Sequence, residues 1–511
     1  MNSVAAYDWI ASHARSRPDY VALIDDFSGR RLTYAELDWR VAALAGFLKE
    51  ELRVAAGDRV AVLAHNSTNI LEVQFACMRV GALLVPLNVR LAVAELIEVI
   101  EDCGARILFH DRDFAAAARE AVAGGCVVTV EMNESGGGCP YEDAISGQRR
   151  CRDVHRALLS DTWTLIYTSG TSGRPKGVLI SYQMTFYNAV NYGIATGLTS
   201  DSHGLTFLPM FHISGLNLPA NPTLFCGGTV TVMRRFDPAR ALWLLANQDH
   251  PISHAFGVPA NFLFISQSPE FAGADLRGVR SLGVGGAPMP ISLLQAYADK
   301  GVGIQQAFGM TETGPLVTML GAAQAIQKLG SSGPAVVHVE TMIADQNGQR
   351  IDSCGEMGEL RVRGPSVTVG YWNRPTETAA AFRDGWLCTG DLAKQDADGC
   401  YYIVDRSKNM YISGGENIYP AEVKRVIERL PGVLEVAVVA EPDDKWGEVG
   451  HAYVLADPAS GLTESDVMRH CRRVIAGYKI PKTISFVEEM PRNATGKIDR
   501  LRLGRRTDTI G

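Results

Sequence analysis

Eleven residues in the first half of the chain decide the fold: Tyr167-Thr168-Ser169-Gly170-Thr171-Ser172-Gly173-Arg174-Pro175-Lys176-Gly177. A predicted strand, Thr162 to Tyr167, leads into this loop of glycines and hydroxyl residues. Glycines let backbone N–H groups approach anionic oxygens, hydroxyl groups add donors, and Lys176 adds a positive charge. The P-loop of nucleotide triphosphatases is excluded, because it requires Gly-Lys followed by Ser or Thr, whereas here Lys176 precedes Gly177. The loop favours phosphate binding, although a loop of this composition is by itself more often plain protein surface.

Composition and charge describe a soluble multidomain protein. At 511 residues the chain exceeds one ordinary core, which predicts about two to four structural units. With 46% hydrophobic and 21% charged residues it is neither disordered nor collagen-like, and the net charge of -7 gives no electrostatic reason to expect nucleic acid.

The ten cysteines include no CxxC pair, so free thiols are expected rather than a zinc site or a redox motif. No signal-peptide pattern and no membrane-spanning apolar run is found, which predicts a cytoplasmic protein.

Short strand patterns alternate with helical patterns over most of the chain. Val60–Ala64 predicts a buried strand, Leu91–Ile100 a helix and Arg106–Phe109 the next strand. Thr33 as N-cap, with Glu36 at the capping-box position, predicts the start of another helix. The alternation predicts an α/β fold with a largely parallel sheet.

The pattern changes from about Gly355, where strands joined by tight turns begin. Asp396-Ala397-Asp398-Gly399 predicts a hairpin turn before a strand at Tyr401–Val404. A compact αβ pattern then follows, with helices at Ala421–Leu430 and Glu464–Ile475 and strands at Val436–Ala440 and Ile484–Val487. We therefore predict a domain boundary near Lys408, between an N-terminal domain of residues 1–407 and a C-terminal domain of residues 408–511.

Four further segments accompany the phosphate loop: Gly285-Gly286-Ala287-Pro288, Phe308-Gly309-Met310-Thr311-Glu312-Thr313, Trp386-Leu387-Cys388-Thr389-Gly390-Asp391 and Pro491-Arg492-Asn493-Ala494-Thr495-Gly496-Lys497. With these five segments in order, nearly the whole chain resembles the adenylate-forming enzyme superfamily, and within it the acid–CoA ligases. The resemblance implies a large multi-layer α/β N-terminal domain and a small, mobile α+β C-terminal domain. It also implies activation of a carboxylic acid to acyl-AMP with ATP and Mg²⁺, followed by thioester formation with coenzyme A.

The resemblance assigns most of these residues to ATP. It implies phosphate contacts from Thr168, Ser169, Gly170, Thr171, Ser172, Gly173 and Lys176. It implies an adenosine site made of Gly286, Ala287, Pro288, Phe308, Gly309, Met310, Asp391 and Arg406. Glu312 would hold Mg²⁺, which prefers carboxylate, water and phosphate oxygens, while Thr311 would donate to the α-phosphate and Lys497 would bridge it to the substrate carboxylate. Because both reactants are anionic, catalysis would be mainly charge neutralisation and positioning.

The same resemblance implies that the C-terminal domain rotates between two half-reactions. Lys408 matches the hinge of the family. Gly414 and Gly415 would face the tunnel for the pantetheine arm of CoA, where a missing side chain lets a thin thiol pass. Trp446 resembles a CoA-contacting position, with a partly buried structural tryptophan as an equal alternative.

The segment Phe211-His212-Ile213-Ser214 indicates the class of acid. Amino-acid-activating relatives carry an aspartate at the position of His212, whereas aryl and fatty acid–CoA ligases resemble this chain in carrying a histidine near the reacting carboxyl group. The expected acyl pocket is small or apolar and comprises Gly215, Leu216, Gly283, Val284, Gly285, Gly314, Pro315 and Leu316. Residues 258–264 lack the arginine of malonate-activating relatives. The resemblance therefore favours an uncharged acyl body that is aromatic, medium-chain or polycyclic.

Three alternatives stay open. A stand-alone adenylation enzyme would load an acyl carrier protein, although the predicted glycine-lined tunnel favours CoA, and a luciferase-like oxygenase shares the scaffold. A non-catalytic nucleotide or acyl-adenylate sensor is a different class, and the joint presence of the expected catalytic lysine, magnesium ligand and ribose-binding residues argues against it. AMP formation measured with and without CoA discriminates among these functions. The oligomeric state is also open, with a homodimer among the alternatives.

Overall fold

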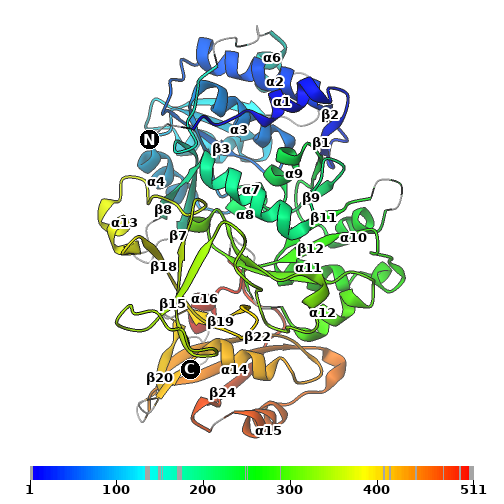
Figure 1. Ribbon diagram of the computed structural model, residues 1–511, viewed down its shortest axis with the longest axis vertical. Helices are drawn as coiled ribbons and strands as arrows, with labels where there is room; N and C mark the ends of the chain where they lie inside the picture. The colour runs from blue at the N-terminus through cyan, green and yellow to red at the C-terminus, as the bar shows by residue number, and fades with distance from the viewer. Residues whose placement is uncertain are drawn as a thin grey trace.

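The computed structural model describes residues 4–132, 139–147, 151, 154–169, 175–247, 249, 251–287, 289–406, 409–413, 416–443, 446–475, 477–493 and 497–505. The molecule is elongated, with the N-terminal elements at one end and a small sheet of C-terminal strands at the other (Figure 1). The described strands form four β-sheets.

Two large sheets form most of the N-terminal part. One has six strands, in the order β6 (Val128–Met132), β5 (Ile107–Asp111), β3 (Arg59–Leu63), β4 (Leu83–Pro86), β7 (Thr162–Ser169) and β8 (Pro175–Ser181). The other has eight, in the order β14 (Leu316–Met319), β13 (Ile304–Gly309), β12 (Ser281–Val284), β11 (His254–Gly257), β9 (His203–Thr206), β10 (Thr229–Val232), β1 (Val21–Asp25) and β2 (Arg31–Thr33). Neighbouring strands run parallel, except that the edge strands β8, β14 and β2 are antiparallel. The predicted α/β fold with a largely parallel sheet is confirmed.

Helices separate and cover these two sheets. Helix α3 (Thr68–Val80) lies between them, because it contacts β1 of one sheet and β4 and β7 of the other, and all of its residues are buried. Helix α2 (Tyr34–Gly46) packs against α3 and begins with the predicted capping box, in which Thr33 and Glu36 bond each other's backbone. The other helices of this part are α1 (Trp9–Ser16), α4 (Val93–Cys103), α5 (Ala115–Ala121), α6 (Pro140–Gly147), α7 (Tyr182–Thr196), α8 (Ile213–Asn217), α9 (Ala220–Cys226), α10 (Pro238–Ala246), α11 (Pro259–Ser266), α12 (Ile291–Ala298) and α13 (Pro375–Ala381).

Two smaller sheets follow. An antiparallel sheet contains β15 (Glu340–Ala344), β16 (Met357–Arg363), β18 (Trp386–Gln395), β17 (Phe382–Arg383) and β19 (Tyr401–Arg406). The C-terminal sheet contains β21 (Glu416–Ile418), β20 (Tyr411–Ser413), β23 (Gly447–Ala456), β22 (Val433–Asp443) and β24 (Thr483–Phe486), of which β24 runs parallel to β23. Helices α14 (Pro420–Ile427), α15 (Glu464–Val474) and α16 (Arg500–Arg505) accompany this last sheet (Figure 1).

The predicted elements agree with the observed ones to within a few residues at their ends. The strand predicted at Val60–Ala64 is β3, the helix at Leu91–Ile100 is α4, and the turn at Asp396–Gly399 joins β18 to β19. All ten cysteines lie in described segments and are free, as expected. Among the helices described, none has the length and apolar character to cross a membrane.

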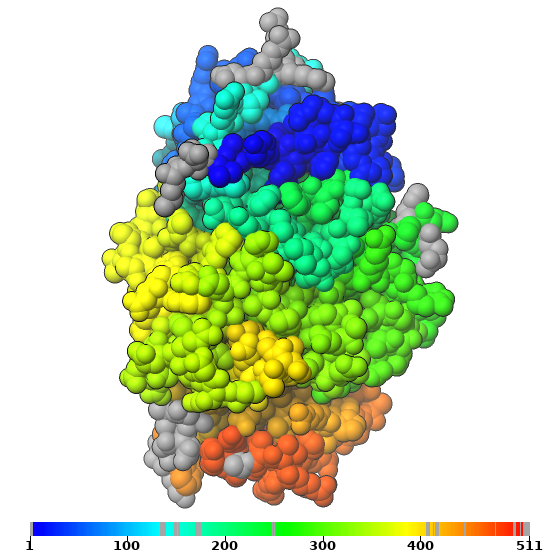
Figure 2. Space-filling view, in the orientation of Figure 1, coloured from blue at the N-terminus to red at the C-terminus, as the bar shows by residue number. Residues whose placement is uncertain are grey.

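The hydrophobic core is divided in the same way as the sheets. Three clusters of buried side chains belong to the N-terminal part and two belong to the segment from Tyr411 onward. In the described chain, none of these clusters contains buried residues from both parts. The space-filling view shows the C-terminal segment as a separate orange layer under the rest of the molecule (Figure 2). The C-terminal part therefore has its own core.

Candidate active site

A cavity of about 560 Å³ lies between the N-terminal part and the C-terminal sheet. Residues of α11, α12, β13 and β18 line one side, and residues of α14, β22 and the segment before α16 line the other. The cavity brings together six of the predicted site residues, drawn from four distant sequence segments: Gly286, Ala287, Phe308, Gly309, Asp391 and Lys497.

Lys497 reaches this cavity from the C-terminal part. A short loop holds its backbone, because Lys497 N–H donates to Asn493 Oδ1 (3.1 Å) and Asn493 N–H donates to the carbonyl oxygen of Lys497 (2.8 Å). Its Cε atom lies 3.1 Å from the position that a Cβ atom on Gly286 would take, and Gly286 has a positive φ of 82°. The aliphatic part of the Lys497 side chain therefore packs on the backbone of the N-terminal part, in the space that a side chain at position 286 would occupy.

The hairpin of β18 and β19 carries the predicted ribose-binding pair. Asp391 and Arg406 are register partners across this hairpin, and Asp391 is 5% exposed at the wall of the cavity. The backbone N–H of Asp391 donates to Thr389 Oγ1 (3.1 Å), whose hydroxyl donates to the carbonyl oxygen of Leu360 (2.6 Å). The part of β18 that presents Asp391 is thus bonded to the neighbouring strand β16. The side chain of Arg406 lies outside the described residues.

The phosphate loop connects two antiparallel strands. Thr168 of β7 pairs with Lys176 of β8, so both predicted phosphate ligands stand at the same end of this hairpin. The hydroxyl of Tyr167 donates to Asp102 Oδ2 (2.6 Å), which fastens the hairpin to the end of α4. The loop residues Gly170, Thr171, Ser172 and Gly173 and the side chain of Ser169 lie outside the described residues.

Glu312 occupies a short 3₁₀ turn, Thr311–Thr313, and is 9% exposed. Its Oε1 accepts a hydrogen bond from the hydroxyl of Tyr371 (2.9 Å). Burial, followed by the negative charge of Glu312, raises the pKa of Tyr371 well above its ordinary value, so this hydroxyl stays protonated and donates. No lysine or arginine of the described segments forms an ion pair with Glu312. A buried carboxylate that forms no ion pair within the described segments is a group that fits Mg²⁺, which takes hard oxygen ligands from protein and phosphate together.

The residues expected around the acid are mostly buried. His212 is the N-cap residue of α8, and its ring centroid lies 4.5 Å from that of Phe211. Leu216 and Leu316 are each 1% exposed. A Cβ atom on Gly215 would overlap the backbone carbonyl of Pro209, so this glycine permits close packing of α8 on the preceding loop. Gly215 therefore adds no width to a pocket.

Gly283 and Gly285 make room for a residue that the sequence analysis missed. A Cβ atom on Gly283 would overlap the ring of Phe256, and one on Gly285 would lie 3.0 Å from Phe256 Cζ. Phe256 stands opposite Gly283 in the parallel pair of β11 and β12. An aromatic ring therefore fills the space beside these two glycines.

Gln306 and Tyr371 were also missed. Gln306 lines the cavity from β13, and its buried Nε2 has no hydrogen-bond partner among the residues described. The only signal for Gln306 in the sequence is that it is a polar residue, next to Gln305, within a buried strand. A buried polar side chain without a hydrogen-bond partner calls for an explanation, such as a ligand. Tyr371 looks like an ordinary packing residue in the sequence Gly370-Tyr371-Trp372, and nothing local points to Glu312.

Several predicted residues of the hinge and CoA region are not described. Lys408, Gly414 and Gly415 lie outside the described residues, as does Pro288 of the expected adenosine site. Trp446 is described and is 48% exposed, with its backbone N–H donating to Asp443 Oδ1 (2.9 Å). Its ring is therefore accessible from solvent.

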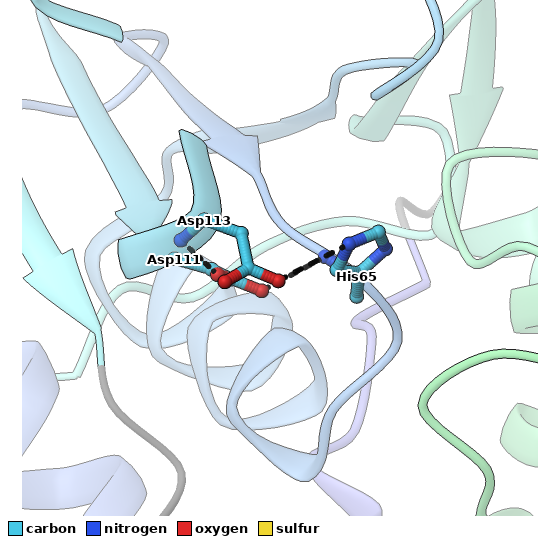
Figure 3. Close-up of side chains that lie close together, drawn as sticks. All are labelled: His65, Asp111 and Asp113. Atoms are coloured by element: carbon cyan, nitrogen blue, oxygen red, sulfur yellow. Dashed lines mark hydrogen bonds and ion pairs between the residues drawn. The ribbon is translucent and has the colours of Figure 1, made fainter. Parts of the chain in front are cut away.

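A second polar cluster lies elsewhere: His65 follows β3, Asp111 is the last residue of β5, and Asp113 lies in the 3₁₀ turn Arg112–Phe114 that comes next (Figure 3). Arg234 Nη2 lies 2.9 Å from Asp111 and 3.1 Å from Asp113, and Arg235 donates to both Asp113 and His65 Nε2 (3.1 Å each). Burial, then the charge of Arg235, lowers the pKa of His65, which keeps this nitrogen an acceptor. Two guanidinium groups already balance the carboxylates, so the cluster is an ion-pair network rather than a metal site.

Comparison with known proteins agrees with this geometry. Residues 10–372 match the AMP-binding enzyme family, and residues 422–497 match the AMP-binding enzyme C-terminal domain. The chain is 40% identical over 490 residues to a feruloyl-CoA synthase of Amycolatopsis sp. (96% of each chain) and 38% identical over 497 residues to an indoleacetate–CoA ligase of Aromatoleum aromaticum (96% of each chain). The solved o-succinylbenzoate CoA synthetase from Bacillus subtilis, in complex with its acyl-adenylate intermediate, superposes with a TM-score of 0.85 at 31% identity, covering 98% of each chain. The chain belongs to the AMP-binding enzyme family and is an acid–CoA ligase that forms AMP.

Proposed function

We propose that this ligase activates an aryl acid whose ring is joined to the carboxyl group by a short linker. The observation that carries the proposal is the ring of Phe256, which lies against Gly283 and Gly285 where the acyl pocket is expected. An aromatic ring at the boundary of the acyl pocket would favour a flat aromatic ligand, since offset or edge-to-face ring pairs contribute about 0.5–1.5 kcal/mol beyond simple burial. The names of two relatives, a feruloyl-CoA synthase and an indoleacetate–CoA ligase, support the same class of acid.

The composition of one segment near the expected acyl pocket argues against a dicarboxylate. Residues 258–264, which form the start of α11, contain no arginine or lysine. A second carboxylate buried against this segment would find no cationic partner within it, and an unpaired buried carboxylate costs several kcal/mol or becomes protonated. Malonate-type acids are therefore expected to be poor substrates.

In the proposed first half-reaction the carboxylate of the acid attacks the α-phosphate of ATP, and pyrophosphate leaves. Lys497 places its ammonium group between these two anions and lowers their repulsion. Asp391 accepts hydrogen bonds from the ribose hydroxyls with its two carboxylate oxygens, and Phe308 stacks on adenine. Glu312 would hold Mg²⁺, which when bound neutralises phosphate charge.

In the proposed second half-reaction the C-terminal part rotates about Lys408 and presents Gly414, Gly415 and Trp446 to CoA. The separate cores support this rotation, since no cluster of buried side chains in the described chain would have to be broken. One contact that would be released is the cation–π pair in which the guanidinium carbon of Arg492 lies 5.7 Å from the ring centroid of Phe264.

A panel of acids tests the substrate class. Ferulate, indole-3-acetate, octanoate and malonate are each assayed for AMP formation with CoA, with a pantetheinylated carrier protein, and with neither acceptor, and the thioester is identified by mass spectrometry. We expect the highest kcat/KM for an aryl acid with CoA. A higher kcat/KM for octanoate or malonate contradicts the proposed class, and faster turnover with the carrier protein contradicts CoA as the acceptor.

The variant Phe256→Leu tests the ring itself. Because it keeps an apolar side chain of similar size, it should lower the ratio of kcat/KM for aryl over alkyl acids by about two- to tenfold. Phe262→Leu is the matched control. Phe262 lies on α11 and is buried against Tyr297 and Gly257 rather than against Gly283. An equal loss of selectivity in both variants would assign the effect to general loosening of the core.

A further inference from the structure

Tyr371 touches two groups that the expected ATP site needs, although it belongs to none of the recognised segments. Its hydroxyl donates to Glu312 Oε1 (2.9 Å). Its ring lies under the side chain of Lys176, whose Nζ atom is 5.4 Å from the ring centroid. One side chain therefore connects the lysine of the phosphate loop with the carboxylate expected to hold Mg²⁺.

The backbone around Tyr371 is fixed to both of these neighbours. Tyr371 forms a β-bridge with Val178 of β8, and the N–H of Trp372 donates to the carbonyl oxygen of Gly177 (2.7 Å). Three residues earlier, Thr368 N–H donates to the carbonyl oxygen of Glu312 (2.8 Å). The segment is thus bonded to the phosphate-loop hairpin on one side and to the turn of Glu312 on the other, so the position of the Tyr371 ring is determined by two separate parts of the fold.

The hydroxyl also supplies the polar partner of a buried charge. Glu312 is 9% exposed, and its side chain receives no other hydrogen bond within the described part of the chain. The bond engages one carboxylate oxygen and leaves the second for another ligand. Partners of this kind orient a metal-binding carboxylate, and their loss typically lowers metal affinity or activity about 10- to 100-fold.

We infer that Tyr371 is a positioning residue for adenylation: its hydroxyl orients Glu312 toward Mg²⁺, and its ring holds Lys176 toward the phosphates of ATP. The inference rests on the proposed role of Glu312. The two functions belong to different atoms of one side chain, so they can be separated by substitution. Tyr371→Phe removes only the hydroxyl, whereas Tyr371→Leu removes the ring as well.

The test measures binding as well as turnover. ATP binding to the full-length enzyme is followed by titration calorimetry over a series of Mg²⁺ concentrations. Tyr371→Phe should raise the Mg²⁺ concentration for half-maximal ATP binding about tenfold and leave ATP affinity at saturating Mg²⁺ near the wild-type value. Tyr371→Leu should in addition weaken ATP binding at saturating Mg²⁺. Tyr402→Phe is the matched control, because it removes a comparable hydrogen bond to Asp396 Oδ2 (3.2 Å) away from the cavity, and it should change neither quantity.

The double variant Glu312→Gln/Tyr371→Phe separates failure of this inference from failure of the magnesium site. If Tyr371 acts through Glu312, the double variant should have the Mg²⁺ requirement of Glu312→Gln alone. A wild-type Mg²⁺ requirement in Glu312→Gln would overturn the proposed role of Glu312. Two results would overturn the positioning role of Tyr371. One is a raised Mg²⁺ requirement in Glu312→Gln together with an unchanged Mg²⁺ requirement in Tyr371→Phe. The other is that the effects of the two substitutions on the Mg²⁺ requirement are fully additive in the double variant.

Discussion

The N-terminal and C-terminal parts of this ligase differ in how they are held together and in what they contribute to the cavity. The N-terminal part contains two sheets around the fully buried helix α3, and its core includes the ring cluster of Trp9, Phe75, Trp163 and Tyr182. The C-terminal part has one sheet with a smaller core that is mostly aliphatic, and it contributes Lys497 from a loop. In the proposed mechanism, the surface for the substrates therefore belongs to the part with the larger core, while a part with its own, smaller core brings the ammonium group of Lys497 for the first half-reaction.

Removal of that ammonium group should have the largest effect. Lys497→Ala is expected to slow acyl-adenylate formation about 10²- to 10³-fold, the scale for loss of one preorganised electrostatic group. The rate is measured as ATP–pyrophosphate exchange. Lys482→Ala is the control, since Lys482 is an exposed lysine of the same part that pairs with Asp443, and it should be near wild type. Less than a tenfold loss in Lys497→Ala would mean that the lysine beside Gly286 is not the catalytic one.

The next effect concerns the stability of the N-terminal part. Glu72 on α3 is fully buried and accepts from Arg40 (2.9 Å), Arg30 (3.2 Å) and Tyr141 (2.7 Å). Glu72→Gln should cost about 3–5 kcal/mol of unfolding free energy, because two half-buried arginines lose the fully buried one of the two carboxylates that they share, Glu72 and Glu142. Calorimetry should show this as a lower Tm. Glu422→Gln removes a more exposed pair with Lys479 (2.8 Å) in the C-terminal part and should change Tm far less. Equal shifts would contradict the contrast between the two parts.

The Glu72 network also has a defined pH dependence. Burial alone would raise the pKa of Glu72, but Arg40 and Arg30 outweigh it and lower that pKa below its ordinary value. A carboxyl group with a lowered folded-state pKa stabilises the protein above its unfolded-state pKa, and this stabilisation is lost as the pH falls toward the folded-state value. The Tm difference between wild type and Glu72→Gln should therefore be full at neutral pH and shrink only in acid.

A smaller pH effect is expected from His254. Burial lowers the pKa of this histidine from 6.5 to about 4, and its Nε2 lies 3.1 Å from the carbonyl oxygen of Thr196. Below about pH 6.5 the unfolded chain takes up a proton that the folded protein excludes, so stability falls as the pH falls. Between pH 6.5 and pH 5 this amounts to about 2 kcal/mol. The difference in unfolding free energy between wild type and His254→Gln should shrink by that amount from pH 7 to pH 5, and a constant difference would refute the buried neutral state.

The smallest effect concerns the CoA step. Trp446→Ala should raise the KM for CoA about two- to tenfold and leave ATP–pyrophosphate exchange unchanged, as expected for loss of one ring contact. Trp243→Ala is the matched control, because Trp243 is 53% exposed in the N-terminal part, comparable with 48% for Trp446. An unchanged KM for CoA in Trp446→Ala would remove Trp446 from the proposed CoA surface.

The sequence predicted the parts of the site that lie within contiguous motifs. Phe308, Asp391 and Lys497 belong to strings of six or seven residues, and the structure brings all three to one cavity. The pattern of turns and alternating residues likewise predicted the hairpin of β18 and β19, because both signals are local. Fold and nucleotide site were therefore largely predictable.

Residues whose role depends on strand register or on long-range pairing were not predictable. The ring of Phe256 fills space beside Gly283 only because β11 and β12 pair in one particular register. Tyr371 meets Glu312 across 59 residues of chain, and its own neighbours in the sequence give no hint of a carboxylate. In both cases the role depends on tertiary contacts, which the sequence does not show. The residues next to a glycine or a tyrosine in the sequence do not indicate whether it lines a pocket or packs in a core.

The contrast between the two parts is tested most directly by the second half-reaction of Lys497→Ala. The variant and the wild type are each mixed with a supplied acyl-adenylate and CoA, and thioester formation is followed in a single turnover by rapid quench. Because Lys497 serves only the first half-reaction in this account, the thioester should form at a rate within about threefold of wild type, while adenylation falls about 10²- to 10³-fold. An equal fall in both half-reactions would show that the C-terminal part does not alternate between two roles.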